Sequence, residues 1–130
     1  MLFSVLIYSS EDVIDALSEG EIEEILSHHY AFQDRTKSEK SFGAAVKLMS
    51  TGTAVTLHRP QEELLVTDGP FAETKEQLMG FYLLEADTLD EAIEAVKLLP
   101  LDKNKVEIRP VSYFDGANFR DADRLVLDAS

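Results

Sequence analysis

The chain has 130 residues, of which 45% are hydrophobic and 28% charged, a balance typical of one globular domain that can bury a core. Its formal net charge of −13 disfavours nucleic acid and anionic membranes as partners, because binding to either relies on clustered Lys and Arg. The absence of cysteine excludes disulfides and thiolate sites, and it suits a reducing compartment such as the cytoplasm.

The first expected elements are a buried strand and a long helix. Residues 2–8 carry apolar side chains on both alternating faces, which is typical of a central strand, and the run is too short and lacks the basic leader of a secretory signal. Ser18 and Glu21 have the spacing of a capping box, so we expect a helix to begin there and to end near Lys40. Its inward stripe is expected to contain Ile22, Ile25, Leu26, His29 and Phe32.

The middle of the chain predicts short strands and sharp turns. Strands are expected over 44–49, 53–58 and 63–67, with residues 59–62 as the hairpin turn between the last two. Asp68-Gly69-Pro70 is typical of a turn, because Asp bonds nearby backbone, Gly permits positive φ and Pro cannot continue a ladder.

The last part predicts a buried strand, a helix and a final strand. Residues 78–85 load both faces of a strand with apolar side chains, and 105–111 is the last expected strand. Thr88 and Glu91 predict a second capping box and helix, stopped by Pro100. The inward residues of that helix are expected to be Leu89, Ile93, Val96 and Leu99.

This order of elements is the split βαβ pattern with an inserted hairpin, so we predict an α+β, ferredoxin-like domain over residues 1–111 and a C-terminal extension over 112–130. Two helices can cover only one face of such a sheet. A second copy packed face to face about a two-fold axis is the simplest cover of the other face, which predicts a homodimer. The alternative is that residues 112–130 fold back across that face.

The histidines are the most informative polar residues. His28 and His29 point about 100° apart on a helix and cannot grip one metal together, and His58 stands alone, so we expect no metal and no cofactor. His29 faces inward, where an imidazole can act as acid or base, or is simply a hydrogen-bonded core residue. Asp68 is either a carboxylate partner at a strand end or a residue that stabilises its own turn. Spacing alone favours the structural interpretation of each.

The stretch 66–83, with Asp68-Gly69-Pro70-Phe71 near its start, resembles the YCII-related family, specifically its DGPF-domain branch. The similarity extends back through 6–8 and forward through 89–92 to 106–111. It implies a ferredoxin-like fold assembled as a dimeric α+β barrel, with a cleft between helix and sheet. It also implies an active-site pair, a His on the first helix and an Asp at a strand end, which correspond here to His29 and Asp68.

The resemblance supplies a fold more securely than a reaction, since most of the family has no known function and some members accompany alternative sigma factors. The Gly that family members often carry after the first helix corresponds to a position near Lys40, so we expect the helix end to be shifted.

Two hypotheses for the function follow from these features. The first is a small-molecule-binding or acid–base enzyme-like barrel, in which His29 exchanges a proton and Asp68 orients or charges the imidazole. The second is a non-catalytic interaction module, whose dimer and acidic surface recruit a protein such as a basic transcription factor.

Overall fold

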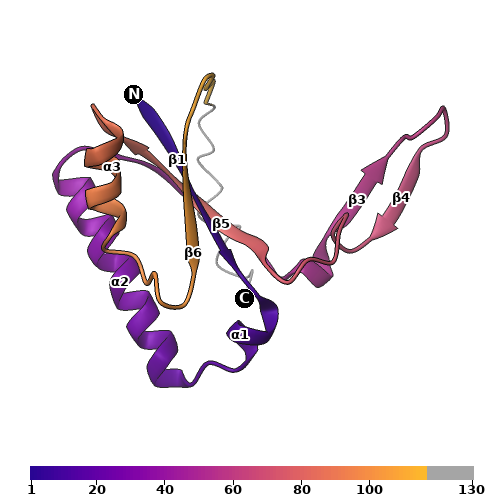
Figure 1. Ribbon diagram of the computed structural model, residues 1–130, viewed down its shortest axis with the longest axis horizontal. Helices are drawn as coiled ribbons and strands as arrows, with labels where there is room; N and C mark the ends of the chain where they lie inside the picture. The colour runs from indigo at the N-terminus through magenta and orange to yellow at the C-terminus, as the bar shows by residue number, and fades with distance from the viewer. Residues whose placement is uncertain (117–130) are drawn as a thin grey trace.

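The computed structural model describes residues 1–116. The elements are, in chain order, β1 (Leu2–Ser9), α1 (Glu11–Asp15), α2 (Glu19–Ser38), β2 (Phe42–Lys47), a 3-10 turn (Thr51–Thr53), β3 (Val55–His58), β4 (Leu65–Asp68), β5 (Gln77–Glu85), α3 (Leu89–Val96) and β6 (Lys105–Pro110). The body of the molecule is a four-stranded antiparallel sheet in the order β2-β5-β1-β6, with α2 and α3 on one side (Figure 1). This arrangement confirms the predicted α+β, ferredoxin-like fold with an inserted hairpin.

The central strands β1 and β5 build the core under the helices. Phe3 and Val5 of β1 are buried, as are Tyr82 and Leu84 of β5, and they pack in one cluster with helical side chains. Because successive side chains of a strand point to opposite faces, the residues between them point away from the helices. The helical members of the cluster are Phe32, Ala92, Ala95, Val96 and Leu99, the last of these just after α3.

The side of the sheet that faces away from the helices is apolar along its central strands and charged along the edge strand β6. We call it the open face; β1, β2 and β5 contribute Leu2, Ser4, Leu6, Tyr8, Ala44, Val46, Phe81 and Leu83, and β6 contributes Lys105, Glu107 and Arg109. Leu6, Phe81 and Val46 are direct neighbours across three strands. The prediction that β1 and β5 carry apolar residues on both faces is therefore confirmed. The alternative cover, the extension 112–130, lies mostly outside the described residues.

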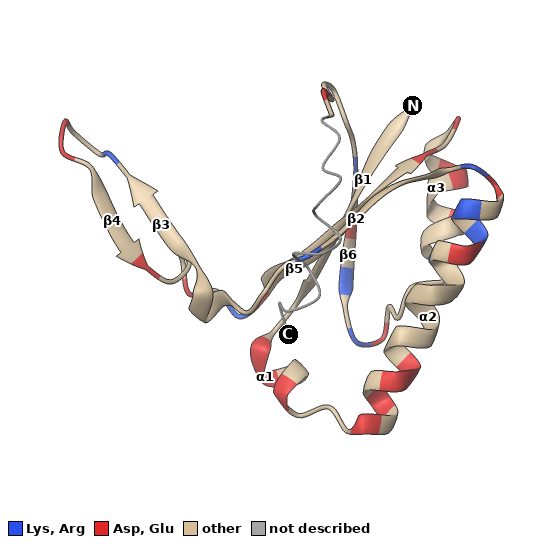
Figure 2. Cartoon of the chain, turned by 180° about the vertical axis from the view of Figure 1, so that it is seen from behind, with Lys and Arg blue, Asp and Glu red and all other residues tan. Residues whose placement is uncertain are grey.

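A capping box begins α2, as predicted. The Glu21 N–H donates to the Ser18 hydroxyl at 3.1 Å, and the Ser18 N–H donates to the Glu21 carboxylate at 3.1 Å. Acidic residues lie at the start of α2 and basic residues near its end (Figure 2), a distribution that suits the helix dipole. Neither α2 nor any other helix within residues 1–116 is long and apolar enough to cross a membrane.

The buried face of α2 differs from the predicted stripe. Phe32 and Thr36 are buried, whereas Ile22 and Leu26 remain 43% and 42% exposed. The prediction that these two residues face inward is wrong, because both fully buried positions lie in the second half of the helix and its first half packs less closely on the sheet.

In α3 the predicted capping box and the predicted buried face are also only partly correct. Thr88 caps the helix by accepting from the Glu91 N–H at 3.2 Å, but the Glu91 carboxylate accepts from Asp87 and not from the cap residue, so the predicted reciprocal box is incomplete. The small residues Ala92 and Ala95 are buried, and Leu89 and Ile93 are exposed, contrary to expectation. Alanines let the helix approach the sheet closely, which turns the larger side chains outward; Val96 and Leu99 are buried as predicted.

The end of α2 explains the departure from the family pattern near Lys40. The Ser41 N–H donates to the Thr36 carbonyl at 2.8 Å and the Lys40 N–H to the Lys37 carbonyl at 3.1 Å, the two bonds of a Schellman motif. Lys40 has φ of 59°, the left-handed conformation that this motif requires and that glycine adopts without strain. The helix therefore ends at Ser38, near Lys40 as expected, with a lysine at the position that favours glycine.

Replacement of Lys40 by glycine is expected to stabilise the protein by up to about 1 kcal/mol, because the steric cost of a left-handed side chain exceeds the entropy that glycine adds to the unfolded chain. Chemical denaturation measures the change. Lys40→Ala is the control, since it removes the same charge but keeps the Cβ atom; equal effects of the two substitutions would contradict this explanation.

The hairpin β3–β4 extends from the body as an arm, which we define as residues 55–71. Its two strands pair with each other and not with the main sheet, with Val55 opposite Asp68 and Leu57 opposite Val66. The arm is inserted between the neighbouring strands β2 and β5, which pair up to Lys47 and Gly80. It projects on the side of the molecule away from the helices (Figure 1).

Candidate functional site

A cluster of three polar side chains lies between α2 and the sheet. His29 and Gln33 are four positions apart on α2, so they share one face of the helix, and Tyr82 points toward them from β5. His29 Nδ1 lies 2.7 Å from the Tyr82 hydroxyl, and Gln33 Nε2 donates to the same oxygen at 3.0 Å. The imidazole is therefore held at the boundary between the core and solvent.

The number of protons in this cluster favours one form of the imidazole. The Tyr82 oxygen accepts from Gln33, and its own proton finds an acceptor in His29 Nδ1. In this arrangement His29 is neutral and carries its proton on Nε2. If Nδ1 carried the proton instead, the Tyr82 hydroxyl would accept twice, and its proton would have no acceptor among residues 1–116.

Burial and nearby positive charges both favour the neutral form of His29. Burial lowers the pKa of His29 below its ordinary value of 6.5, and the charges of His28 and Lys47 lower it further. The folded state thus binds this proton more weakly than the unfolded state does, and the contribution of His29 to stability is lost as the pH falls from about 6.5 through the lower folded pKa. Burial also raises the pKa of Tyr82, although the Gln33 bond opposes this, so the hydroxyl keeps its proton near neutral pH.

Aromatic packing fixes the orientation of Tyr82. Its ring centroid lies 4.6 Å from that of Phe32, 6.5 Å from that of Phe42 and 5.8 Å from that of His29, with which it is stacked. A ring held from several sides keeps its hydroxyl in one place, so the His29 ring is oriented by contacts that extend into the core.

Asp68, the second residue expected in the site, lies elsewhere in the chain. It is the last residue of β4, in the arm, and none of the hydrogen bonds within residues 1–116 joins it to His29. Its pairing partner across the hairpin is Val55. The expected pair of His29 and Asp68 is thus not formed within a single chain, because the arm leads Asp68 away from the helices (Figure 1).

The remaining histidines and the acidic residues form no metal site among residues 1–116. His28 Nδ1 lies 3.2 Å from the Leu98 carbonyl, and His58 belongs to the arm. Two depressions on the described surface lie around the end of α2 and α3, the larger with a volume of about 320 Å³, and neither includes His29, Tyr82 or Asp68.

Sequence reasoning missed Tyr82 and Gln33 as members of the cluster. Gln33 was predictable from the sequence as a neighbour of His29, since it follows His29 by about one helical turn. Tyr82 can be recognised as a member of the cluster only once the position of β5 relative to α2 is known. Its alternate position in an apolar strand marked it as a core residue, and its hydroxyl needed a partner there.

An antiparallel sheet of this order, with two helices on one face and a polar cluster beneath the longer one, defines a ferredoxin-like α+β protein with a half-buried histidine. The chain belongs to the YCII-related family, whose domain matches residues 1–115. A similar protein is the uncharacterized protein R00369 of Rhizobium meliloti (strain 1021), 38% identical over 117 residues, which are 88% of this chain and 94% of that protein. Family membership identifies the fold and leaves the reaction to be argued from the site.

The charge of Lys47 offers a direct test of the electrostatics at His29. Lys47→Gln is expected to raise the pKa of His29, because a positive charge that opposes imidazolium is removed. NMR titration of the ring resonances measures the midpoint, with three histidines to assign. Lys97→Gln is the control, since Lys97 is not among the charges that lower this pKa. An unchanged midpoint in Lys47→Gln would refute the assigned cause.

Proposed function

We propose that this chain is a subunit of a homodimer that binds a small organic molecule beside His29 and exchanges a proton with it through that imidazole. The observation that carries the proposal is the 2.7 Å contact between His29 Nδ1 and the Tyr82 hydroxyl, with Gln33 donating to the same oxygen. Such a chain of bonds orients the imidazole, and its Nε2 atom makes no hydrogen bond with any other residue of 1–116, which is the arrangement an acid–base group needs.

The two tautomers of His29 define what the site can do. With the proton on Nε2, the neutral ring donates a hydrogen bond to a carbonyl or carboxylate oxygen of a ligand, and only the doubly protonated imidazolium form donates a proton. Rotation of the Tyr82 hydroxyl allows Nδ1 to carry the proton, and Nε2 then accepts one. The positive charge of Lys47 nearby favours a ligand with a negative or polarised oxygen. Asp68 is proposed as the carboxylate that stabilises the imidazolium form.

Two further features belong to the same proposal. The segment Asp68-Gly69-Pro70-Phe71 supports a place in the DGPF-domain branch of the family. The absence of cysteine supports a cytoplasmic location, where disulfides would not form. The dimer is supported by the apolar open face, which the two helices on the other side leave available for a second copy.

A thermal-shift screen of metabolites that carry carbonyl or carboxylate groups tests the acid–base site. A ligand that binds the folded state raises the melting temperature by mass action, and the rise is expected to disappear in His29→Gln and to shrink in Tyr82→Phe. His58→Gln is the matched control, because His58 is an exposed histidine of the arm and is not among the charges that lower the pKa of His29. A ligand whose effect is the same in His29→Gln and in the control would refute the site.

A non-catalytic interaction module is the second candidate, favoured by exposed aromatic side chains. Phe71 is 90% exposed and Tyr113 is 79% exposed, and aromatic groups in such positions are common in protein interfaces. Titration calorimetry with a purified alternative sigma factor tests this role. Binding of equal strength to the unaltered chain and to His29→Gln would favour the module, and the absence of binding would count against it.

A further inference from the structure

The arm is a structural element without a partner of its own. A two-stranded hairpin is marginally stable at best in water, and β3 and β4 pair only with each other. Its apolar side chains are exposed, with Leu57 at 62% and Val66 at 59%. Exposed apolar surface of this kind marks a contact with another molecule.

One face of the arm combines apolar side chains with a carboxylate. The register places Val55, Leu57, Val66 and Asp68 on this face, because directly paired residues share a side and residues two apart on a strand share it too. Thr56 and Thr67 are paired on the opposite face. Whatever covers the apolar face therefore also receives Asp68.

An exposed apolar stripe on α2 is the surface that fits this face. Ile22, Leu26 and Tyr30 follow each other at four-residue steps and are all exposed, so they line one side of the helix. His29 and Gln33 lie on the same side of the helix: His29 is next to Tyr30, and Gln33 follows Tyr30 by about one turn. The stripe is apolar around a histidine, and the arm is apolar around a carboxylate. The two surfaces therefore match in their apolar character, and the carboxylate can accept a hydrogen bond from the imidazole.

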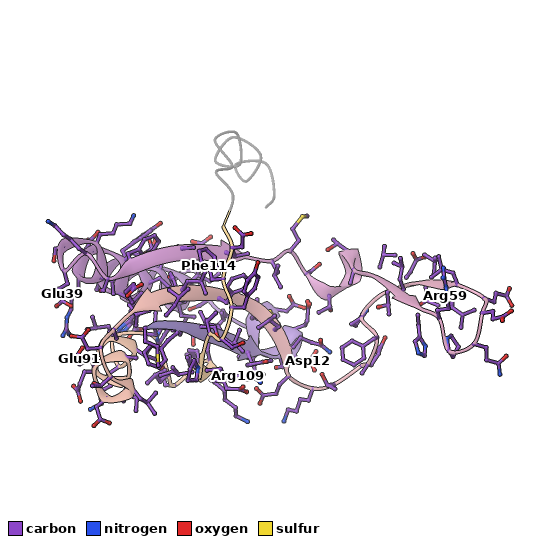
Figure 3. All side chains as sticks on the ribbon, turned by 90° about the horizontal axis from the view of Figure 1, so that it is seen from above. Asp12, Glu39, Arg59, Glu91, Arg109 and Phe114 are labelled. Atoms are coloured by element: carbon purple, nitrogen blue, oxygen red, sulfur yellow. The ribbon has the colours of Figure 1, made fainter. Side chains whose placement is uncertain are left out.

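The geometry rules out contact between these surfaces within one chain and favours a second copy. The helices lie on one side of the sheet, and the arm bends toward the other side, which is the side of the open face (Figure 1). Arg59 at the tip of the arm lies at the far end of the molecule from Glu39 and Glu91 (Figure 3). A second copy seated on the open face therefore lies on the side toward which the arm extends.

We infer that the arm of one subunit packs its apolar face on the α2 stripe of a second copy and brings Asp68 to the partner's His29. This inference rests on the homodimer proposed above. It assigns the two residues of the acid–base pair to different subunits. Each dimer then has two composite sites, related by the two-fold axis.

Disulfide cross-linking between subunits tests the contact, and the chain is well suited to it because it has no cysteine. Chains carrying Val66→Cys are mixed with chains carrying Leu26→Cys, allowed to exchange subunits, and oxidised. A cross-linked dimer is expected in the mixture, with a yield several-fold above that of either chain alone. Two controls share these elements but point elsewhere: Thr67→Cys on the opposite face of the arm and Ala31→Cys on the far side of α2.

The outcomes separate the contact from the dimer on which it rests. Light scattering that shows a dimer, together with equal cross-linking of Val66→Cys and Thr67→Cys, would overturn the arm contact and leave the dimer standing. A monomer at all concentrations would overturn both. All four cysteine positions are exposed, so the substitutions leave the core unchanged.

An NMR titration of His29 is the second measurement and requires no cross-link. If Asp68 reaches the partner's His29, Asp68→Asn lowers the midpoint of His29 in the dimer, because a carboxylate that favours imidazolium is removed. Glu62→Gln, near the tip of the arm, is the control and leaves the midpoint unchanged. An unchanged midpoint in Asp68→Asn would overturn the shared site.

Discussion

Replacement of Leu83 by glutamate is expected to separate the proposed dimer into monomers. Leu83 lies on the open face, in the middle of the sheet, with the uncharged Ser4 and Ala44 as its direct neighbours on the adjoining strands and Arg109 one strand further along the same row. Burial of an unpaired carboxylate costs several kcal/mol, so we expect the association to weaken by about two orders of magnitude or more. Sedimentation or light scattering over a range of concentrations measures this change.

The control for this substitution is Ala31→Glu, which adds the same charge on the exposed side of α2. Circular dichroism of both variants establishes that the monomer remains folded. A Leu83→Glu protein that associates as strongly as the unaltered chain would place the dimer contact on some other surface.

Replacement of Phe32 by alanine is expected to lower the free energy of unfolding by about 3–5 kcal/mol. Phe32 is 1% exposed, belongs to the core cluster and packs against the Tyr82 ring at 4.6 Å. The substitution removes a large buried side chain and leaves a cavity beside the ring that holds His29. Urea denaturation measures the loss of stability, with Tyr113→Ala as the control because that aromatic side chain is 79% exposed.

Phe32→Ala is also expected to change the environment of His29, because Phe32 packs against the Tyr82 ring that contacts this imidazole. Once Phe32 is absent, the Tyr82 ring has one fewer neighbour to fix it, and the ring resonances of His29 are expected to broaden or shift. Loss of stability below about 1 kcal/mol would show that the surrounding side chains collapse into the space, contrary to the packing described.

The elements with strong local signals were predictable from the sequence. Ser18 and Glu21 fix the start of α2 through bonds between residues three apart, and the turn at Asp68-Gly69-Pro70 depends on the backbone preferences of those residues alone. The order of strands and helices followed from these local features. α1 was missed because it has only five residues and none of them is buried.

The orientation of the helices and the composition of the site depend on contacts between distant residues. The apolar side chains of α2 predicted one inward stripe that included Ile22 and Leu26, whereas the sheet buries Phe32 and Thr36. The partnership of His29 with Tyr82 joins residues 53 positions apart, for which no spacing rule exists. Asp68 was identified as a candidate through a resemblance, and its place in the arm is a property of the three-dimensional structure.

The way the arm joins the sheet has a consequence for engineering. The arm and the segments that join it to the body begin and end at paired positions of neighbouring strands, where the Leu48 N–H donates to the Met79 carbonyl at 3.0 Å. Closing a loop between such ends costs only slightly more when the loop is longer, so the segment can be exchanged for a shorter or longer hairpin without altering the register of the sheet. The scaffold and its projecting hairpin can therefore be redesigned separately, which makes this chain a starting point for proteins that keep one body and display different recognition segments.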